Sequence, residues 1–276
     1  MKNFYIIISE NKNKSIENTK RKLIERFDRY GGLVTYDVYE GYLGRDFRIP
    51  EHIDCVITVG GDGTMLRAAR AAFGRPVAFI GINRGHMGYL TEVSEIRDYD
   101  SLVERLINDD FMIEERMMLA AKVRRNGRTI FRDFALNDVL LGKNDSVHMM
   151  GYEVYVNGTL LNTYRADGVV VSSPTGSTGY SLSAGGPIAS PSAKLLILTP
   201  ICPHAINTRS IVLSAGDKVK IVPLSDNLLV SCDGADGTEV RIGDEIIVTR
   251  STHAMKFIRL KEASFLDTLR DKMRVV

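Results

Sequence analysis

A glycine-rich turn between a strand pattern and a helix pattern is the feature that most constrains the fold of this chain. Cys55 to Val59 (CVITV) is a β-branched run without polar alternation, which is typical of a strand buried on both faces of a parallel sheet. The segment from Thr64 (TMLRAARAAF) has the alanine, leucine and arginine content of a helix. Glycines let a ligand approach the backbone, and a helix N-terminus favours anions. The turn therefore predicts a phosphate site.

Asp62 is an unusual residue for such a turn, because a carboxylate repels a phosphate. A proton-transfer role or a bound metal would explain it. The simpler interpretation is a side chain that caps the helix expected to begin near Thr64. The turn alone leaves both interpretations open.

Strand and helix patterns alternate over the first part of the chain. The expected strands are residues 4–8, 33–39, 55–59 and 77–80. A helix is expected from about Ser15 to Tyr30, with an apolar stripe at Ile16, Leu23, Ile24 and Phe27, and another over residues 99–107. A second glycine-rich loop (GINRGHMGYL) covers residues 81–90. This pattern predicts an α/β domain over residues 1–110, with an open, mostly parallel sheet that binds ligands at the carboxyl ends of its strands.

The pattern changes after about residue 110. Two Asn-Gly pairs, at residues 126–127 and 157–158, adjoin strand-like runs and predict hairpins. Further strands are expected at residues 169–171, 195–198, 219–222, 228–232, 245–249 and 255–260. We therefore expect residues 111–276 to form a β-rich, sandwich-like domain. A last helix over residues 264–273 is expected to return to the first domain.

Composition narrows the class of protein. The 276 residues include 36 basic and 34 acidic side chains, a net charge of +2 that gives no support for nucleic acid as the main partner. Three widely spaced cysteines without zinc-site spacing are typical of reduced thiols in a cytoplasmic protein. No apolar run approaches the length of a membrane span, so no membrane partner is expected.

A stretch rich in hydroxyl side chains, SSPTGSTGYSLSAGGP over residues 172–187, is the second informative feature. It has many Ser and Thr residues and several glycines but no charged side chain. A flexible linker would look similar, but Pro174, Tyr180 and Leu182 argue against a linker. The stretch therefore favours a neutral pocket for a nucleoside, with Tyr180 available to stack or to donate a hydrogen bond.

Two upstream pairs could add polar groups to such a pocket. Asn137 can donate to and accept from a base edge, and Asp138 can accept from a ribose hydroxyl, although alone they could equally form a turn. Arg165 and Asp167 could contact a ligand or form a surface ion pair. These residues taken singly do not decide between the two readings.

The order of three motifs decides the matter. GGDGT, then LND, then RADGVVVSSPTGSTGYSLSAGGPI extend over nearly the whole chain, and together they resemble the bacterial NAD kinase family. The resemblance implies a transfer of the terminal phosphoryl group of ATP, accompanied by Mg²⁺, to the 2′-hydroxyl of the adenosine ribose of NAD. It also implies a homodimer or a homotetramer. Lipid kinases share a GGDGT-type turn, and a silent dinucleotide sensor would also bind NAD, so both remain alternatives.

The resemblance implies a role for each matching residue. Asp62 is the expected base that takes the 2′-hydroxyl proton, and no residue is implied as a metal ligand. The remaining matches are expected to bind the dinucleotide. They are Gly63 beside it, Asn137 and Asp138 at the adenine and ribose, His148 in a loop near the nucleotide, Arg165 and Asp167 on the nicotinamide side, Thr175, Thr178, Gly179, Tyr180, Ser181, Leu182 and Ser183 around the adenosine, and Cys202 with His204 in a segment that can reach a neighbouring subunit.

Three positions depart from the family pattern. Asp138 stands where a Glu is usual, and it is one methylene shorter, so its carboxylate would reach the ribose through a water. Gly179 stands where alanine is common. Ala235 follows Asp233-Gly234 where Gln is frequent, so no contact is implied for Ala235.

Overall fold

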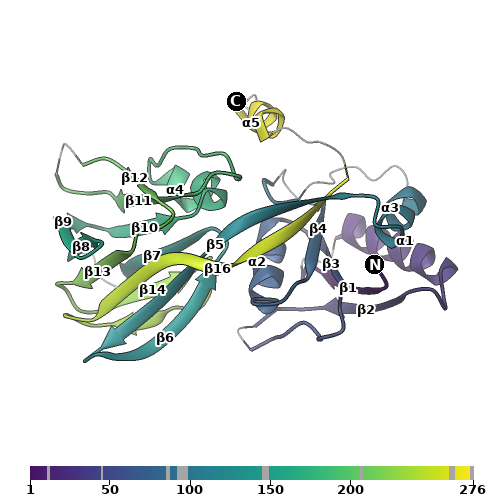
Figure 1. Cartoon of the computed structure of the whole chain (residues 1–276), viewed down its shortest axis with the longest axis horizontal. Helices are drawn as coiled ribbons and strands as arrows, with labels where there is room; N and C mark the ends of the chain where they lie inside the picture. The colour runs from purple at the N-terminus through teal and green to yellow at the C-terminus, as the bar shows by residue number, and fades with distance from the viewer. Residues whose placement is uncertain are drawn as a thin grey trace. The chain divides into compact units, whose positions relative to one another are not determined.

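The chain forms two compact units in a computed structural model, which describes residues 1–10, 13–44, 46–84, 88–91, 99–144, 149–205, 208–260 and 265–273. The first unit consists of Met1–Glu115 and Met255–Val276, and the second unit is Arg116–Ala254. The segment expected as the second domain is therefore divided between the two units. Figure 1 shows the elements of each unit.

A parallel sheet forms the centre of the first unit. Its strands run in the order β2, β1, β3, β4 and β16, and each neighbouring pair is parallel. Their bounds are β1 Asn3–Ile8, β2 Thr35–Glu40, β3 Cys55–Gly60, β4 Ala78–Asn83 and β16 Glu245–Arg259. Strands β3 and β4 are buried at every position, as expected for a sheet covered on both faces.

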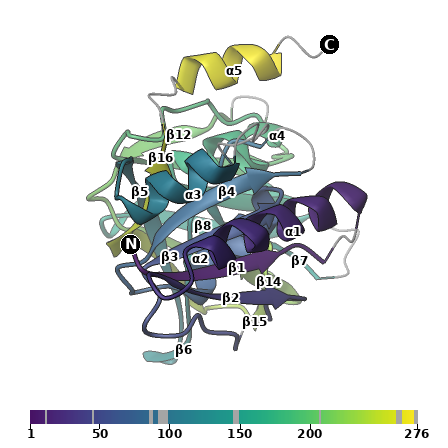
Figure 2. The same ribbon diagram turned by 90° about the vertical axis from the view of Figure 1, so that its right-hand side faces the viewer.

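Helices cover both faces of this sheet. Helices α1 (Lys14–Arg29) and α3 (Tyr99–Ile107) share one apolar core with the strands and lie on the same side of the sheet (Figure 2). In the predicted stripe of α1, Ile24 is only partly buried, and Thr19 is buried instead. Thr58 lies between two β3 residues that face this core, so its side chain points to the other side. There its Oγ1 contacts Met65 Sδ of α2 (Asp62–Ala71) at 3.9 Å.

Two antiparallel sheets enclose the core of the second unit. One has the order β12, β11, β10, β7, β14 and β15, and the other continues from β16 through β13 and β8 to β9, with β5 and β6 attached. The bounds are β5 Met112–Arg125, β6 Arg128–Ala135, β7 Asp138–Lys143, β8 Met150–Val156, β9 Thr159–Ala166, β10 Gly168–Ser172, β11 Leu195–Ile201, β12 Ile211–Ser214, β13 Val219–Pro223, β14 Leu228–Cys232 and β15 Thr238–Val240. One apolar cluster draws on both sheets, including Val139 and Val171 from the first and Val154 and Val219 from the second. The predicted fold class, an α/β part followed by a sandwich-like β part, is confirmed.

Both predicted hairpin turns are confirmed. Asn126 and Gly127 have φ angles of 51° and 76°, and Asn157 and Gly158 have 52° and 89°. They join β5 to β6 and β8 to β9. Two consecutive positive φ angles are the requirement of the two-residue turn that matches the twist of the strands.

Some expected boundaries were wrong. Residues 245–249 and 255–260 were expected as two strands, but β16 is one strand through the polar residues between them. β16 pairs with β5 as well as with β4 and β13, and Thr252 and His253 within it are exposed. Gly81 to Asn83 were expected in a loop but belong to β4. Strands β7, β12 and β15 were not predicted.

The last described helix is α5, Phe265–Met273, close to the predicted bounds. Among the described helices, none combines the length and the apolar character that crossing a membrane requires.

Candidate active site

The glycine turn after β3 has a different geometry from the capping interpretation. Gly61 is the N-cap of α2, with extended backbone and no side-chain hydrogen bond to the helix. The helix begins at Asp62, two residues earlier than the expected start at Thr64. Asp62 is therefore inside the first turn of α2, and the interpretation that it caps the helix, one of the two left open, is wrong. A glycine is needed at position 60, because an added Cβ would lie 2.6 Å from Thr64 Oγ1.

The carboxylate of Asp62 is held by the chain that follows β4. Tyr89 N donates to Asp62 Oδ2 at 2.8 Å, and Leu90 N donates to Oδ1 at 3.2 Å. The hydroxyl of Thr91 lies 3.4 Å from Oδ1. Gly88 packs so closely that an added Cβ would lie 1.9 Å from Oδ1. Residues 88–91 therefore fix the orientation of this carboxylate.

Sequence reasoning identified the second glycine-rich loop but did not connect it to Asp62. A usable signal was present, because the buried runs at residues 55–59 and 77–80 are successive and each is followed directly by a glycine. In a parallel sheet, the loops after two adjacent strands lie at the same edge.

This arrangement leaves the carboxylate able to act on a ligand. An ionised carboxylate has about four acceptor positions, and the two amides and one hydroxyl use three of them. Among the described residues, no further donor to Asp62 occupies the remaining position, which a substrate hydroxyl could use. Gly63, one residue further along α2, is exposed, and a Cβ there would meet nothing closer than Arg67 Nη1 at 3.7 Å.

In the second unit, the predicted Asn137 is held at the start of β7. Ser173 N donates to Asn137 O at 2.8 Å, and a Cβ on Gly176 would lie 2.1 Å from the same oxygen. Asn137 Oδ1 and Thr175 Oγ1 are buried and have no hydrogen-bond partner among the residues that the structure describes. Buried polar atoms normally have a partner. Two such atoms on segments that pack together, Asn137 and the start of the stretch at Thr175, therefore indicate a place where a polar ligand binds.

The hydroxyl-rich stretch forms the short helices η1 (Thr175–Thr178) and α4 (Tyr180–Ser183) beside this place. A Cβ on Gly179 would lie 3.3 Å from Asn137 Nδ2 and 3.7 Å from Asp138 Oδ2, so the structure brings these predicted residues together. Tyr180, Leu182 and Ser183 are exposed, whereas Thr178 is half-buried. Ser181 is fully buried, and its hydroxyl lies 3.2 Å from that of Thr199, so its side chain supports α4 from below.

Two carboxyl groups are close together under this place. Asp138 is 7% exposed, and burial, followed by the charge of Asp233, raises its pKa to about 7. Burial also raises the pKa of Asp233 to about 6, although hydrogen bonds from three backbone amides act in the opposite direction. The sequence alone assigned Asp233 no role beyond its place in the Asp233-Gly234 pair that precedes Ala235.

The remaining predicted residues lie at the opposite end of the same strands. On β10, Ser172 pairs with Asp138, whereas Gly168 pairs with Gly142 and Ile201. Four residues of strand correspond to about 13 Å. Arg165, Asp167 and Cys202 lie beyond this far end and are therefore not brought together with Asn137.

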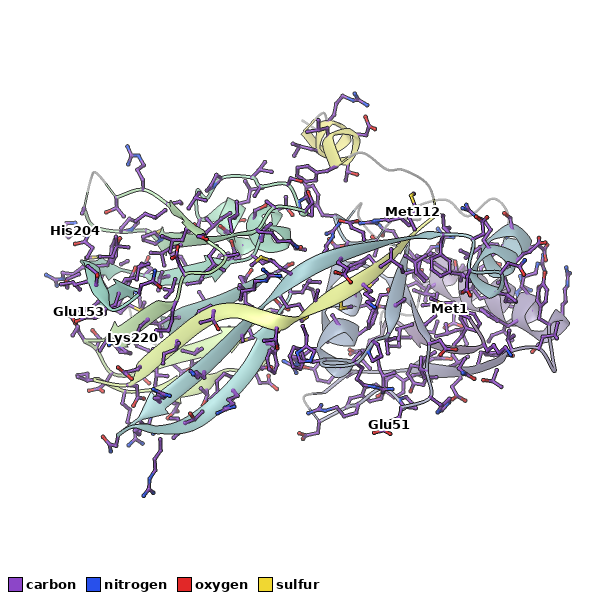
Figure 3. All side chains as sticks on the ribbon, viewed as in Figure 1. Met1, Glu51, Met112, Glu153, His204 and Lys220 are labelled. Atoms are coloured by element: carbon purple, nitrogen blue, oxygen red, sulfur yellow. The ribbon has the colours of Figure 1, made fainter. Side chains whose placement is uncertain are left out.

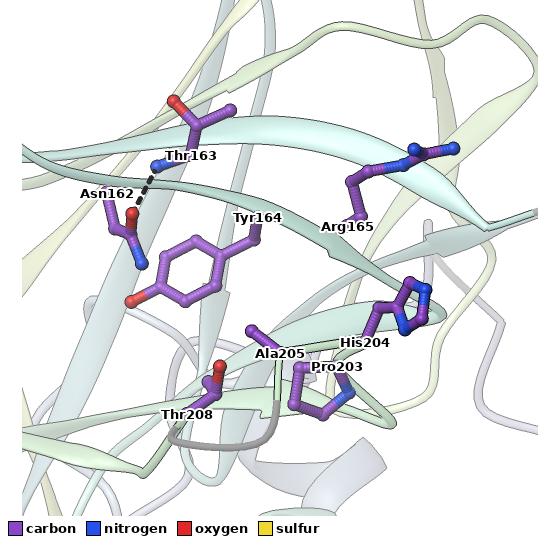
Figure 4. A pocket seen from close by; sticks show the side chains of 8 residues that line it. All are labelled: Asn162, Thr163, Tyr164, Arg165, Pro203, His204, Ala205 and Thr208. Atoms are coloured by element: carbon purple, nitrogen blue, oxygen red, sulfur yellow. Dashed lines mark hydrogen bonds between the residues drawn. The ribbon is translucent and has the colours of Figure 1, made fainter.

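A hollow of about 340 Å³ opens at this far end, lined in Figure 4 by Asn162, Thr163, Tyr164, Arg165, Pro203, His204, Ala205 and Thr208. His204 N donates to Arg165 O at 2.9 Å, and the His204 side chain is exposed (Figure 3). Cys202 is exposed, with a φ of 45°. Asp167 forms an ion pair with Lys143 at 2.7 Å, whereas the ion-pair interpretation, one of the two left open, had suggested Arg165 as its partner. His148 lies outside the described residues.

No metal ligands are assigned in either unit. Within the described ranges, no three His, Cys, Asp or Glu side chains cluster in a way that could hold an ion. None of the three cysteines forms a disulfide in the described part of the chain, and Cys55 and Cys232 are buried.

Known proteins resemble this chain over both units. The ATP-NAD kinase N-terminal domain matches residues 6–111, and the ATP-NAD kinase C-terminal domain matches residues 136–260. The NAD kinase of Lachnospira eligens is 41% identical over 241 residues, which cover 82% of each chain. The NAD kinase of Ruminiclostridium cellulolyticum is 35% identical over 282 residues, which cover 99% of this chain and 98% of the relative.

Two solved structures share the fold. Yeast NADH kinase complexed with NADH has a TM-score of 0.86 at 23% identity, covering 100% of this chain and 87% of that chain. An NAD kinase from Archaeoglobus fulgidus in complex with ATP has a TM-score of 0.79 at 23% identity, covering 99% of both chains. At this identity the likeness concerns the fold. The two bacterial relatives carry the argument further, and they establish that the chain belongs to the NAD kinase family.

Proposed function

We propose that the protein transfers the terminal phosphoryl group of ATP to the 2′-hydroxyl of the adenosine ribose of NAD and so forms NADP and ADP. The observation that carries the proposal is the Asp62 carboxylate, held in one orientation at a glycine turn with an acceptor position left for a hydroxyl. Membership in the NAD kinase family supplies the substrate class.

Asp62 is the proposed general base. As the 2′-oxygen forms a bond to the terminal phosphorus, the bond from that phosphorus to the ADP oxygen breaks, and the hydroxyl proton passes to Asp62. General-base assistance contributes roughly 10²- to 10⁴-fold in rate. The start of α2, which has no side-chain cap, lies at Asp62, and a helix N-terminus favours a phosphate.

The place around Asn137 is the proposed site for the adenosine of NAD. Asn137 Oδ1 and Thr175 Oγ1 have no partner among the described residues, and an adenine edge offers both a donor and acceptors to them. The Asp138 carboxylate lies near Gly179 and would accept a hydrogen bond from a ribose hydroxyl. Tyr180, the first residue of α4, is exposed and is available to contact the base or the sugar.

Mg²⁺ is the proposed companion of ATP. Mg²⁺ in phosphoryl-transfer sites is usually held by substrate phosphates together with one or two carboxylates. When bound, the ion would supply charge neutralisation between the phosphates.

A homodimer or homotetramer is the proposed assembly. Cys202 and His204, which match the family segment that can reach a neighbouring subunit, are both exposed. The hollow beside Arg165 and His204 would then serve the nicotinamide side of NAD bound to a neighbouring copy. Cysteines that are not joined in disulfides are typical of the proposed cytoplasmic location.

A coupled assay tests the function. Purified protein, ATP, Mg²⁺ and NAD are incubated, and NADP is detected with an NADP-specific dehydrogenase. NADP formation is the expected result. NAD binding without NADP formation would point to a silent sensor, and phosphorylation of diacylglycerol in detergent would point to a lipid kinase.

A further inference from the structure

The carboxylate of Asp233 lies against the backbone of Asn137 and Asp138. Asp233 Oδ2 accepts a hydrogen bond from Leu136 N at 2.7 Å, and Oδ1 accepts from Asn137 N and Asp138 N at 2.8 and 3.0 Å. In return, Asp233 N donates to Asp138 O at 3.0 Å. One residue at the end of β14 therefore fixes the backbone that leads into β7.

These amides need an acceptor from a side chain. β7 begins at Asp138, so Leu136 and Asn137 precede its ladder, and Leu136 is fully buried. A buried N–H without a partner is rare, because it loses its hydrogen bond to water. Two oxygens in one plane can serve three amides, and Asp tolerates the φ of 51° found at position 233 better than most residues.

We propose that Asp233 is a positioning residue for NAD: it holds the Asn137 amide and the Asp138 carboxylate toward Gly179 and the start of η1. The inference rests on the proposed function. Ser173 N binds Asn137 O from the opposite side at 2.8 Å, so both backbone polar groups of Asn137 are occupied. Its side chain, whose Oδ1 has no partner among the described residues, is thereby left for the ligand.

Asp233 has a second effect on the same site, through its charge. Burial is the main cause of the raised pKa of Asp138, and the charge of Asp233 raises it further. Besides burial, the charge of Asp133 of β6 in turn raises the pKa of Asp233. Neutralising Asp233 should therefore lower the pKa of Asp138, whereas a displaced but charged side chain should not.

Two variants separate these effects. Asp233→Asn keeps the shape but removes the charge and one acceptor oxygen, and Asp233→Glu keeps the charge but moves both oxygens. The matched control is Asp217→Asn, because Asp217 also accepts a backbone amide, Ser214 N at 2.8 Å, but at an exposed turn elsewhere in the second unit. NAD binding by calorimetry and kcat/KM for NAD against pH are measured for all three variants and the wild type.

The expected results differ between the variants. Asp233→Asn should raise the Kd and KM for NAD by about tenfold, leave the KM for ATP within about twofold, and move the acid limb of kcat/KM to lower pH. Asp233→Glu should raise the Kd for NAD but keep the acid limb near its wild-type position. Asp217→Asn should match the wild type in both measurements.

Wild-type affinity for NAD in Asp233→Asn, with an unmoved acid limb, would overturn the inference. If that variant does not fold, an unchanged Kd in Asp233→Glu would overturn it. Equal losses in the KM for ATP and for NAD would also count against it, because they indicate general structural damage. A wild type that binds NAD but makes no NADP would refute the proposed function alone, and the Kd comparison would still decide the role of Asp233.

Discussion

Gly88 lies directly against the carboxylate of Asp62, so close that a Cβ at position 88 would be 1.9 Å from Asp62 Oδ1. We expect Gly88→Ala to rotate or displace this carboxylate and to lower kcat by about tenfold or more, because misplacement of a catalytic group by about 1 Å can cost 10²-fold. Steady-state kinetics at saturating ATP and NAD measure the effect. Gly44→Ala is the matched control, since a Cβ there would meet only the Tyr42 ring at 4.0 Å. Equal kcat values for the two variants would contradict the prediction.

Asp62→Asn should separate chemistry from binding. The amide has almost the same shape but cannot take a proton, so we expect kcat to fall by roughly 10² or more while the affinity for NAD stays within about tenfold. Single-turnover kinetics and calorimetry provide the two numbers. A wild-type kcat in this variant would remove Asp62 from the role of base.

Asn137→Ala should act on binding. The side chain has a buried Oδ1 with no partner among the described residues, and its loss removes one proposed hydrogen bond to the adenine. We expect the KM for NAD to rise by about tenfold and kcat to change less, since one hydrogen bond contributes roughly 0.5–1.5 kcal/mol. A large loss of kcat at an unchanged KM would argue for a role elsewhere in the reaction.

The free energy of unfolding should depend on pH through the Asp138 carboxyl. Its pKa rises from 3.8 to about 7 in the folded protein, so the folded state binds more protons than the unfolded state between these pH values. The contribution of Asp138 is therefore complete below about pH 4 and is lost as the pH rises through about 7. The free energy of unfolding of Asp138→Asn minus that of the wild type should therefore be at least about 1 kcal/mol larger at pH 8 than at pH 5. Urea unfolding at the two pH values measures this change, and an equal difference at both would refute it.

Local patterns predicted the elements more reliably than the contacts between them. The β-branched run at Cys55 and the two Asn-Gly pairs specify their own backbone, because a buried parallel strand and a tight hairpin each need particular residue types. The polar run around Thr252 was expected to separate two strands, but β16 continues through it, because strand pairing overrides a local preference.

In the candidate site, too, the sequence predicted individual residues but not their contacts. The motifs selected Asp62, Asn137 and Thr175, whose chemical type is visible in the sequence. The residues that hold them were not visible, because Tyr89 and Leu90 reach Asp62 only through backbone amides and Asp233 reaches Asn137 across 96 residues of chain. Such long-range partners depend on which strands become neighbours, and no short motif records that.

The interrupted first unit has a consequence for synthesis. Lys256 and Phe257 of β16 complete the edge of the first sheet by pairing with Ala78 and Phe79 of β4, yet the ribosome makes them only after the whole second unit. Until then, β4 presents an unpaired edge, which is the kind of surface that attracts other chains. We therefore expect the continuous second unit to finish folding first, and nascent chains stalled before Met255 to depend on chaperones.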